Sequence, residues 1–120
     1  MVNSFRDLVV WQRAIELVKE TYRIIRLLPN EEKYALSDQM RRAVISIPSN
    51  IAEGQARNST KEFIQFLSIA RGSKAELQTQ LIICTQLKYV TEEQINPAMC
   101  LAEEVGKMIG SLITKLTPDH

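Results

Sequence analysis

Apolar side chains recur along this chain at alternating spacings of three and four residues, the period of a helix that packs one face against a core. Four such stretches follow one another, separated by turn and capping residues. Because short links between long helices force neighbouring helices to be antiparallel, the expected fold is an all-α, up-down-up-down four-helix bundle. With 120 residues and 45% hydrophobic content, the chain is expected to form one domain over residues 1–120.

The first helix is expected to follow Ser4, a candidate N-cap, and to end before Pro29, which disfavours helical geometry at the residue before it. Its main apolar seam comprises Leu8, Trp11, Ile15, Val18, Tyr22 and Ile25. Four more apolar side chains lie away from that seam: Val9, Val10, Ile24 and Leu27. One bundle face cannot cover both sets, so this surplus predicts an oligomer.

The second helix is expected to begin at a Ser37 cap and to weaken at Gly54. Its seam continues past Pro48 and comprises Met40, Val44, Ile47 and Ile51. Proline lacks an amide hydrogen and crowds the carbonyl four residues earlier, a defect that costs roughly 3 kcal/mol inside a helix unless its surroundings compensate. Since the three-four spacing is unbroken, the pattern predicts one helix kinked at Pro48 rather than two helices.

Each of the last two helices begins at a reciprocal capping pattern. The pairs are Ser59 with Glu62 and Thr91 with Gln94. The third seam comprises Phe66, Ala70, Ser73, Leu77, Cys84 and Leu87, and the fourth comprises Ile95, Ala98, Ala102, Val105, Ile109, Leu112 and Leu116. Small residues in the middle of the third seam favour the close approach of another backbone. Pro97 is expected near the first turn of the fourth helix, where proline costs little.

Charge and cysteine content narrow the class of protein further. Fifteen basic and 14 acidic residues give a net charge of +1, so the whole-chain field does not require a polyanionic partner. Cys84 and Cys100 both lie among helix-period apolar residues and are expected to be core thiols. No apolar run is long enough to span a bilayer, and the N-terminus lacks the features of a signal peptide. We therefore expect a cytoplasmic protein without a membrane partner.

Enzymatic chemistry has little support in the sequence. The single histidine, His120, is the last residue and a poor base or ligand. Glu53, Glu62 and Glu76 could supply paired carboxylates, but Glu62 is explained by capping and Glu76 by pairing on a helical surface. The chain contains no glycine-rich phosphate loop and no zinc or calcium spacing pattern. We expect no catalytic residue, no metal and no cofactor.

A polar cluster around Pro48 is the first candidate site. Its members are Ser49, Asn50, Glu53, Glu76 and Gln80. In a structural interpretation, polar groups of this cluster satisfy the Val44 carbonyl that proline leaves without a donor, at about 1 kcal/mol per hydrogen bond. In a functional interpretation, they line a polar pocket for a ligand or a partner. The sequence leaves both interpretations open.

Basic residues form the second candidate site, because they are shared unevenly among the helices. The third helix carries four basic and two acidic residues, whereas the fourth carries two basic and four acidic ones. The candidate nucleic-acid contacts are Arg41, Arg42, Arg57, Lys61, Arg71 and Lys74. The alternative is an ordinary solvated surface with ion pairs inside each helix.

Three segments of the chain are distinctive as motifs. They are SIPSNIAEG from Ser46 to Gly54, KEF from Lys61 to Phe63, and GSKAELQTQL from Gly72 to Leu81. Together with FRDLVVWQRA from Phe5, they resemble the bacterial four-helix-bundle proteins encoded in intervening sequences of 23S rRNA genes. That family is distantly similar to the accessory proteins of diversity-generating retroelements. The resemblance extends over almost the whole chain, implies a homopentamer with cyclic symmetry, and implies no established activity.

These observations predict a non-enzymatic oligomeric bundle that binds RNA or another structured nucleic acid through backbone phosphates. A ring of subunits would repeat each basic surface, so a modest charge per chain could suffice. One alternative is a protein-interaction scaffold, or an accessory factor for a partner such as a reverse transcriptase. Another is a passenger of a mobile rRNA insertion with no benefit to its host.

Overall fold

Four α-helices joined by short connections form the protein. They are α1 (Val9–Ile25), α2 (Leu36–Gln55), α3 (Thr60–Gln86) and α4 (Glu92–Leu116). The computed structural model describes residues 4–118, and within this range two single-turn 3₁₀ helices, η1 (Phe5–Asp7) and η2 (Asn30–Glu32), complete the secondary structure without any strand. The all-α four-helix bundle expected from the sequence is confirmed.

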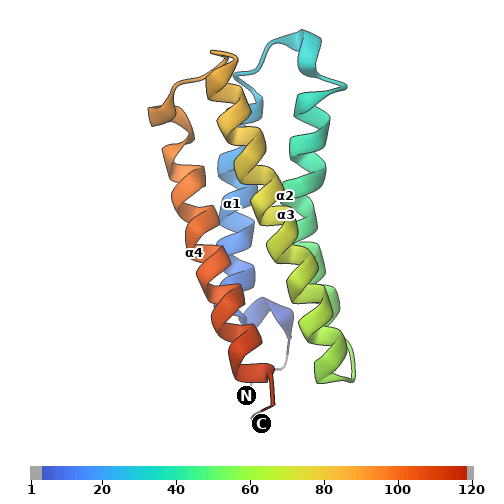
Figure 1. The fold of residues 1–120 in the computed structure, drawn as a ribbon. Helices are drawn as coiled ribbons and strands as arrows, with labels where there is room; N and C mark the ends of the chain where they lie inside the picture. Colours follow the sequence, from blue (N-terminus) through green and yellow to red (C-terminus); the bar gives the residue numbers. More distant parts are fainter. Residues whose placement is uncertain (1–3, 119–120) are drawn as a thin grey trace.

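Each of the four helices has two others as neighbours around a shared core. Consecutive helices run in opposite directions, and the start of α1 and the end of α4 lie at the same end of the molecule (Figure 1). Each helix packs against its neighbours in the chain, and α1 also packs against α4. Within residues 4–118 the diagonal pairs, α1 with α3 and α2 with α4, make no close backbone approach. Every helix therefore keeps an outer face that the other three do not cover.

The seams of α2 and α4 are those that the periodicity predicts. The four α2 positions, Met40, Val44, Ile47 and Ile51, are all fully buried. In α4 the first five positions are buried, while Leu112 and Leu116 are partly buried against the core. Burial of large aliphatic side chains is the main favourable term in forming such a core, at roughly 1.5–3 kcal/mol for each complete burial.

The seam of α1 lies on a different stripe from the one predicted. The buried residues are Val10, Ala14, Leu17, Thr21, Ile24 and Ile25. Of the expected seam, only Ile25 is buried. The others are partly buried and flank the core instead: Leu8, Trp11, Ile15, Val18 and Tyr22. Both stripes repeat with the same three-four spacing, so periodicity cannot choose between them. The prediction took the stripe with the larger side chains. Val10 and Ile24 consequently belong to the core, whereas Val9 and Leu27 are exposed.

The α3 seam is only partly as expected. Ala70, Leu77 and Cys84 are buried, together with Leu67, Gln80 and Leu81, which the prediction omitted. Leu87 was expected in the seam but is exposed, because α3 ends at Gln86 and the chain turns away. Of the two cysteines, Cys84 lies in the core with its sulfur 3.7 Å from that of Met40. Cys100 is exposed on α4, so its placement in the core was wrong.

Two of the predicted caps were wrong. Ser4 accepts a hydrogen bond from the Arg6 N–H and so caps η1, whereas α1 begins only at Val9. Ser37 is buried inside α2. The Glu32 carboxylate accepts the Leu36 N–H at 3.3 Å, which satisfies one free donor at the start of α2.

The remaining starts follow the capping prediction more closely. Thr91 and Gln94 form the complete reciprocal pair at α4, with bonds of 3.1 and 2.9 Å. At α3, Ser59 accepts the Glu62 N–H, but the Glu62 carboxylate accepts from the Ser59 hydroxyl rather than from its backbone. Pro97 is the sixth residue of α4, one turn deeper than expected. Pro48 lies inside an unbroken α2, and the kink there stays a prediction.

Candidate functional site

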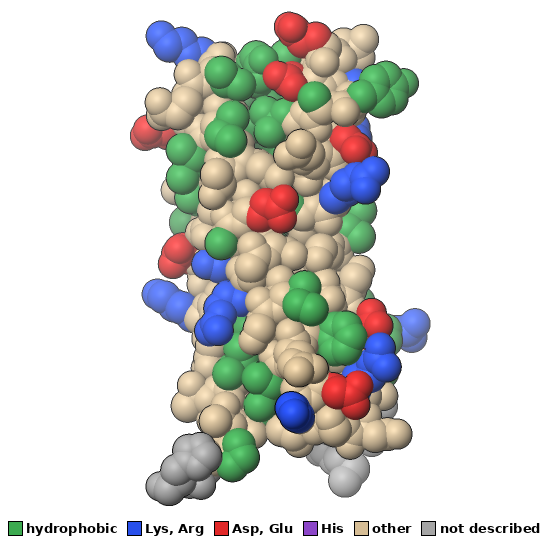
Figure 2. All heavy atoms as spheres, turned by 45° about the vertical axis from the view of Figure 1, so that its right-hand side comes forward, with side chains coloured by type: hydrophobic (Ala, Val, Ile, Leu, Met, Phe, Trp, Pro, Cys, Tyr) green, Lys and Arg blue, Asp and Glu red, His purple; other side chains and the backbone are tan. Residues whose placement is uncertain are grey.

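The six candidate basic residues lie along the length of the α2–α3 pair rather than in one patch. The Ser46 and Ser73 hydroxyls meet at 2.9 Å and set the register of these antiparallel helices. Counting outward from that contact at 1.5 Å per residue, Arg42 and Lys61 lie about 24 Å apart along the helix axis. Figure 2 shows this side of the molecule with basic side chains at several heights and acidic side chains among them.

Three of the six cations are held by carboxylates. Arg41 and Arg42 share Asp38, at 3.9 and 3.0 Å. Arg57 pairs with Glu53 at 2.9 Å and with Glu62 at 3.9 Å. Its guanidinium carbon also lies 5.0 Å from the centre of the Phe66 ring, a cation–π distance. These contacts match the interpretation as a solvated surface with local ion pairs, each worth about 1 kcal/mol or less.

The three cations of α3 are different. Within residues 4–118, Lys61, Arg71 and Lys74 have no carboxylate oxygen within 4.0 Å. Lys74 is nevertheless engaged, because its ammonium donates to the Gln78 side chain at 3.1 Å and its stem covers Gly106 of α4. Lys61 and Arg71 are exposed and available to an outside anion.

The five residues of the expected polar pocket do not meet. Asn50 donates from its side-chain amide to both the Ser46 carbonyl and the Ser46 hydroxyl, each at 2.8 Å. It therefore satisfies Ser46 rather than the Val44 carbonyl that Pro48 leaves without a donor. Glu53 lies on the exposed side of α2 and pairs with Arg57.

Register explains why the other members are remote. Glu53 lies seven residues from Ser46 towards one end of the bundle, and Gln80 lies seven residues from Ser73 towards the other. The two are therefore about 20 Å apart along the axis. Glu76 is exposed on α3. The side-chain oxygen of Gln80, Oε1, is buried without a hydrogen-bond partner among the described residues.

Ser49 lines a groove that the sequence analysis missed. This groove, of about 320 Å³, runs between α1 and α2. Its lining comprises Trp11, Ile15 and Val18 of α1 with Ile45, Pro48, Ser49 and Ala52 of α2. The lining is almost wholly apolar, and its three α1 residues belong to the seam that the periodicity had assigned to the core. The groove brings the distinctive Pro48 segment to the surface beside Trp11.

A cross-helix ion pair also escaped prediction, because sequence spacing carries no signal for partners 91 residues apart. Arg13 of α1 donates two hydrogen bonds of 2.9 Å to the Glu104 carboxylate of α4. The bidentate bond raises the pKa of Arg13 and lowers the pKa of Glu104. Near the connection between α3 and α4, the Tyr89 hydroxyl donates to Glu32 at 2.8 Å, which raises the pKa of Tyr89.

The residues weighed for catalysis are separated or already engaged. His120 lies outside the described residues. Glu62 and Glu53 both contact Arg57, and Glu76 lies well apart from them along α3. Nowhere in residues 4–118 do three side chains of the metal-binding types gather closely enough to hold an ion. None of the helices described there is long and apolar enough to cross a membrane.

The protein is a small all-α bundle. Its distinctive residues lie on helix surfaces and in grooves between helices. The family model for the 23S rRNA-intervening sequence protein matches residues 6–111, so the chain belongs to that family. It is also similar to a crystal structure of a protein with unknown function from the S23 ribosomal protein family of Bacteroides thetaiotaomicron. The two share 29% sequence identity with a TM-score of 0.81, over 88% of this chain and 96% of the other. No curated protein matches this sequence.

Proposed function

We propose that this protein is a non-catalytic, oligomeric bundle of the cytoplasm that binds RNA, or another structured nucleic acid, through its phosphates. The observation that carries the proposal is the pair of exposed cations on α3, Lys61 and Arg71, which have no carboxylate partner within residues 4–118. Membership of a family named for an insertion in 23S rRNA supports RNA as the polyanion.

The distribution of charge also favours the α2–α3 side of the molecule as the nucleic-acid-binding surface. From Leu36 to Gln86 the chain carries six basic and four acidic residues, whereas α4 carries two basic and four acidic ones. Phosphate contacts position a protein on nucleic acid without reading its sequence. We therefore expect binding that depends strongly on salt and little on base sequence.

Assembly is the second part of the proposal, and α3 supports it. Between Gln65 and Leu87, only Arg71 and Glu76 are charged among the exposed side chains. Ile69 and Ile82 are 52% and 45% exposed there. A Cβ atom on Gly72 would meet nothing within 4 Å, so no contact inside the protomer requires this glycine.

The apolar groove between α1 and α2 offers a complementary surface on a different face. Packing the outer face of α3 from one copy into the α1–α2 groove of the next joins two unlike surfaces. Such a heterologous contact closes into a ring when its rotation permits. The family resemblance implies five copies, and a ring of copies would repeat Lys61 and Arg71 around its axis and multiply weak phosphate contacts.

A salt series of RNA binding tests the nucleic-acid proposal. The double variant Lys61→Gln, Arg71→Gln removes two cations without breaking an ion pair, and Lys107→Gln, Lys115→Gln on α4 is the matched control. Each phosphate contact should contribute roughly 0.7 to 0.9 to the slope of log affinity against log salt. The α3 variant should lose affinity and slope for all RNA sequences alike, and the α4 variant should lose little.

Equal losses from both double variants would show that only total charge matters. If neither the wild type nor any variant binds RNA or DNA at low salt, the nucleic-acid proposal fails. The scaffold alternative, including an accessory role beside a reverse transcriptase, would then be the better account. The apolar groove at Pro48 is the observation that favours it.

Light scattering tests assembly independently of RNA. Wild-type protein should have a mass several times that of the 13.7 kDa chain. Ile82→Glu places a charge on the outer face of α3 and should reduce that mass, whereas Ser111→Glu on the exposed side of α4 should not. A wild-type monomer at micromolar concentration would exclude the ring and the multivalency that depends on it.

A further inference from the structure

A shallow hollow of about 380 Å³ lies along the surface of α1, near the end of the helix. Its lining comprises Val18, Lys19, Tyr22, Arg23 and Arg26. Val18 also lines the groove between α1 and α2, so the hollow and the groove adjoin at this residue. The groove is almost wholly apolar, whereas the lining of the hollow contains three cations and no carboxylate. The two surfaces therefore suit different partners.

Helical spacing places the cations around the Tyr22 ring. Lys19 and Arg26 are seven residues apart, so they lie on the same side of α1, about 10 Å from each other along its axis. Tyr22 lies between them on that side. Its ring is half-buried against the core and also borders the hollow. The hollow thus presents an aromatic surface that the core holds in place, with a cation on either side.

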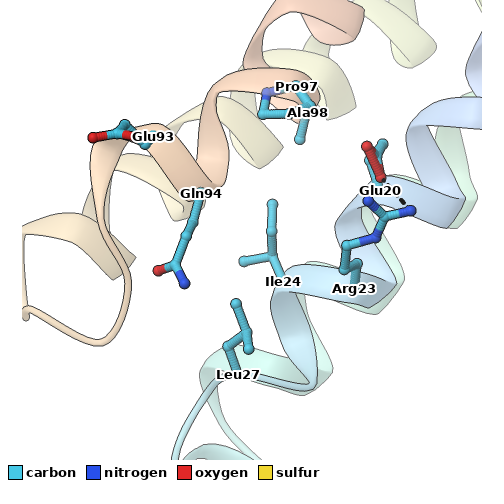
Figure 3. Close-up of a pocket in the computed structure, with 8 residues that line it drawn as sticks. All are labelled: Glu20, Arg23, Ile24, Leu27, Glu93, Gln94, Pro97 and Ala98. Atoms are coloured by element: carbon cyan, nitrogen blue, oxygen red, sulfur yellow. Dashed lines mark ion pairs between the residues drawn. The ribbon is translucent and has the colours of Figure 1, made fainter.

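The cations of the hollow are available to an outside anion. Arg26 is exposed, and among the described residues it has no carboxylate oxygen within 4.0 Å. Lys19 pairs with Glu16 at 3.5 Å, and its side chain is 66% exposed. Arg23 pairs with Glu20 at 3.2 Å beside a second hollow, between α1 and α4 (Figure 3), and its side chain is 71% exposed. Since exposed ion pairs contribute little stability, an anion can bind either cation at little cost.

The helix end alone does not explain this arrangement. Cations are favoured at the end of a helix, because they offset the partial negative charge of its last carbonyls. That reason covers Arg23 and Arg26, which lie in the last turn of α1 and at its C-cap. It does not cover Lys19, and it does not call for an aromatic ring between the cations. A ligand that combines an aromatic ring with negative charge uses every one of these groups.

The composition of the hollow selects the class of ligand. Its cations repel a metal ion or an amine. Inorganic phosphate would be held by the cations but would gain nothing from the Tyr22 ring. Arginine suits phosphate in particular, because its planar guanidinium can donate two parallel hydrogen bonds. A nucleotide supplies both parts, since its base stacks on an aromatic side chain and its phosphates bind cations.

We infer that the hollow binds one unpaired nucleotide together with the phosphates on its two sides. The base stacks on Tyr22, and the phosphates bind Arg26 on one side and Lys19 on the other. The nucleotide is either part of a single-stranded segment of RNA or a free nucleotide with the same groups. The first form rests on the proposed function and adds a base contact to it, whereas the second is independent of it. A base inside a duplex is excluded, because neighbouring bases cover its faces.

Titration calorimetry with small ligands tests the hollow apart from the rest of the protein surface. Adenosine 3′,5′-bisphosphate carries a base and a phosphate on each side of the ribose, adenosine lacks the phosphates, and pyrophosphate lacks the base. The wild-type protein should bind the bisphosphate saturably, and about tenfold more tightly than either control ligand. Equal affinity for pyrophosphate would show that charge alone is recognised and would overturn the inference. Absence of saturable binding would overturn its free-nucleotide form.

Three variants separate the ring from the cations. Tyr22→Leu keeps an apolar side chain against the core, and it should weaken the bisphosphate about tenfold and leave pyrophosphate unchanged. Arg26→Gln should weaken both ligands. Tyr34→Leu is the matched control, because Tyr34 is 87% exposed with the Lys33 ammonium 5.4 Å from its ring centre but lies outside the hollow. It should change neither affinity, and a loss equal to that of Tyr22→Leu would overturn the site. If Tyr22→Leu does not fold, Arg26→Gln and the ligand comparison on the wild type still decide.

Oligoadenylate, alone and in a duplex with oligouridylate, separates this site from the proposed phosphate contacts on α3. Tyr22→Leu should weaken the single strand about tenfold and the duplex little. The double variant Lys61→Gln, Arg71→Gln should weaken both RNAs and leave the bisphosphate unchanged. If Tyr22→Leu binds both RNAs as the wild type does, the RNA form of the inference fails, whatever the α3 variant does. If the α3 variant alone is unchanged, the proposed contacts fail and this site stands.

Light scattering of Tyr22→Leu completes the test. Its mass should equal that of the wild type, because the ring is assigned to a nucleotide. A smaller mass would show that a second copy of the chain covers Tyr22, and it would overturn the inference.

Discussion

Gly54 ends the SIPSNIAEG segment at the place where α2 meets the first turns of α3, and its replacement by alanine measures how close that contact is. Gly54 is buried. A Cβ atom there would lie 2.7 Å from the Phe66 Cβ and 3.0 Å from the Phe63 Cδ1. The Phe66 Cβ is bonded to the backbone, so rotation of the side chain cannot move it away. Only a shift of α3 relative to α2 relieves the overlap.

The expected change in stability follows from two opposing terms. Alanine is favoured over glycine inside a helix by about 1 kcal/mol. Forcing an additional carbon into a packed contact costs about 1–3 kcal/mol. Gly54→Ala should therefore lower the free energy of unfolding by about 0–2 kcal/mol, in spite of its better helix propensity.

Gly72→Ala is the matched control, because a Cβ at Gly72 meets no atom within 4 Å. It should raise the free energy of unfolding of the protomer by about 1 kcal/mol. Since the propensity gain is common to both variants, their difference reports the contact alone, about 1–3 kcal/mol. For a domain of this size, that difference corresponds to about 4 °C in Tm for each kcal/mol.

Urea unfolding followed by circular dichroism measures all three proteins, at several concentrations so that any contribution from assembly is separated. The expected order of stability is Gly72→Ala, wild type, Gly54→Ala. A Gly54→Ala protein as stable as Gly72→Ala would show that α3 moves without cost, and the close contact would lose its significance. If copies pack over Gly72, the same control variant should assemble less well while its protomer is more stable.

Three further outcomes are expected. The pKa of Glu104 is lowered from 4.5 by its bond to Arg13, so the stability it contributes is present above pH 4.5 and lost as pH falls through the lowered pKa. In urea titrations, Glu104→Gln should be less stable than wild type at neutral pH and approach it in acid. Burial raises the pKa of the Cys84 thiol to about 11, so iodoacetamide at neutral pH should modify one thiol, Cys100, by mass spectrometry. A second adduct in folded protein would contradict this. Thr21 is fully buried, and its hydroxyl has no hydrogen-bond partner among the described residues. Thr21→Val should therefore stabilise the protein by about 1 kcal/mol in the same urea assay. A loss of stability would show that the Thr21 hydroxyl does form a hydrogen bond.

The helices could be predicted because their signals are local. In α2 and α4, Met40, Ile51 and Ile109 lie on stripes with no competing stripe of equal spacing, and all are buried. The Thr91–Gln94 pair caps α4 as expected, because its two bonds join residues three apart. Local spacing was insufficient in α1, where two apolar stripes alternate and only packing against α2 and α4 selects the one with Ala14.

The candidate sites could not be placed in the same way. The residue types around Pro48 suggested one polar pocket, but the contact between Ser46 and Ser73 places Gln80 and Glu53 towards opposite ends of the bundle. The bond between Arg13 and Glu104 depends on where α4 lies beside α1. No sequence pattern marks such a pair, because its members are 91 residues apart.

By itself, the sequence determined that this protein is a bundle of four helices, where α3 and α4 begin, and the family to which it belongs. These properties follow from hydrogen bonds and side-chain periods that extend over a few residues. Tertiary structure alone decided which stripe of α1 is buried, which cations keep a carboxylate partner, and which side chains line the groove between α1 and α2. Those properties depend on the rotation and register of one helix against another, which the packing of all four helices sets together.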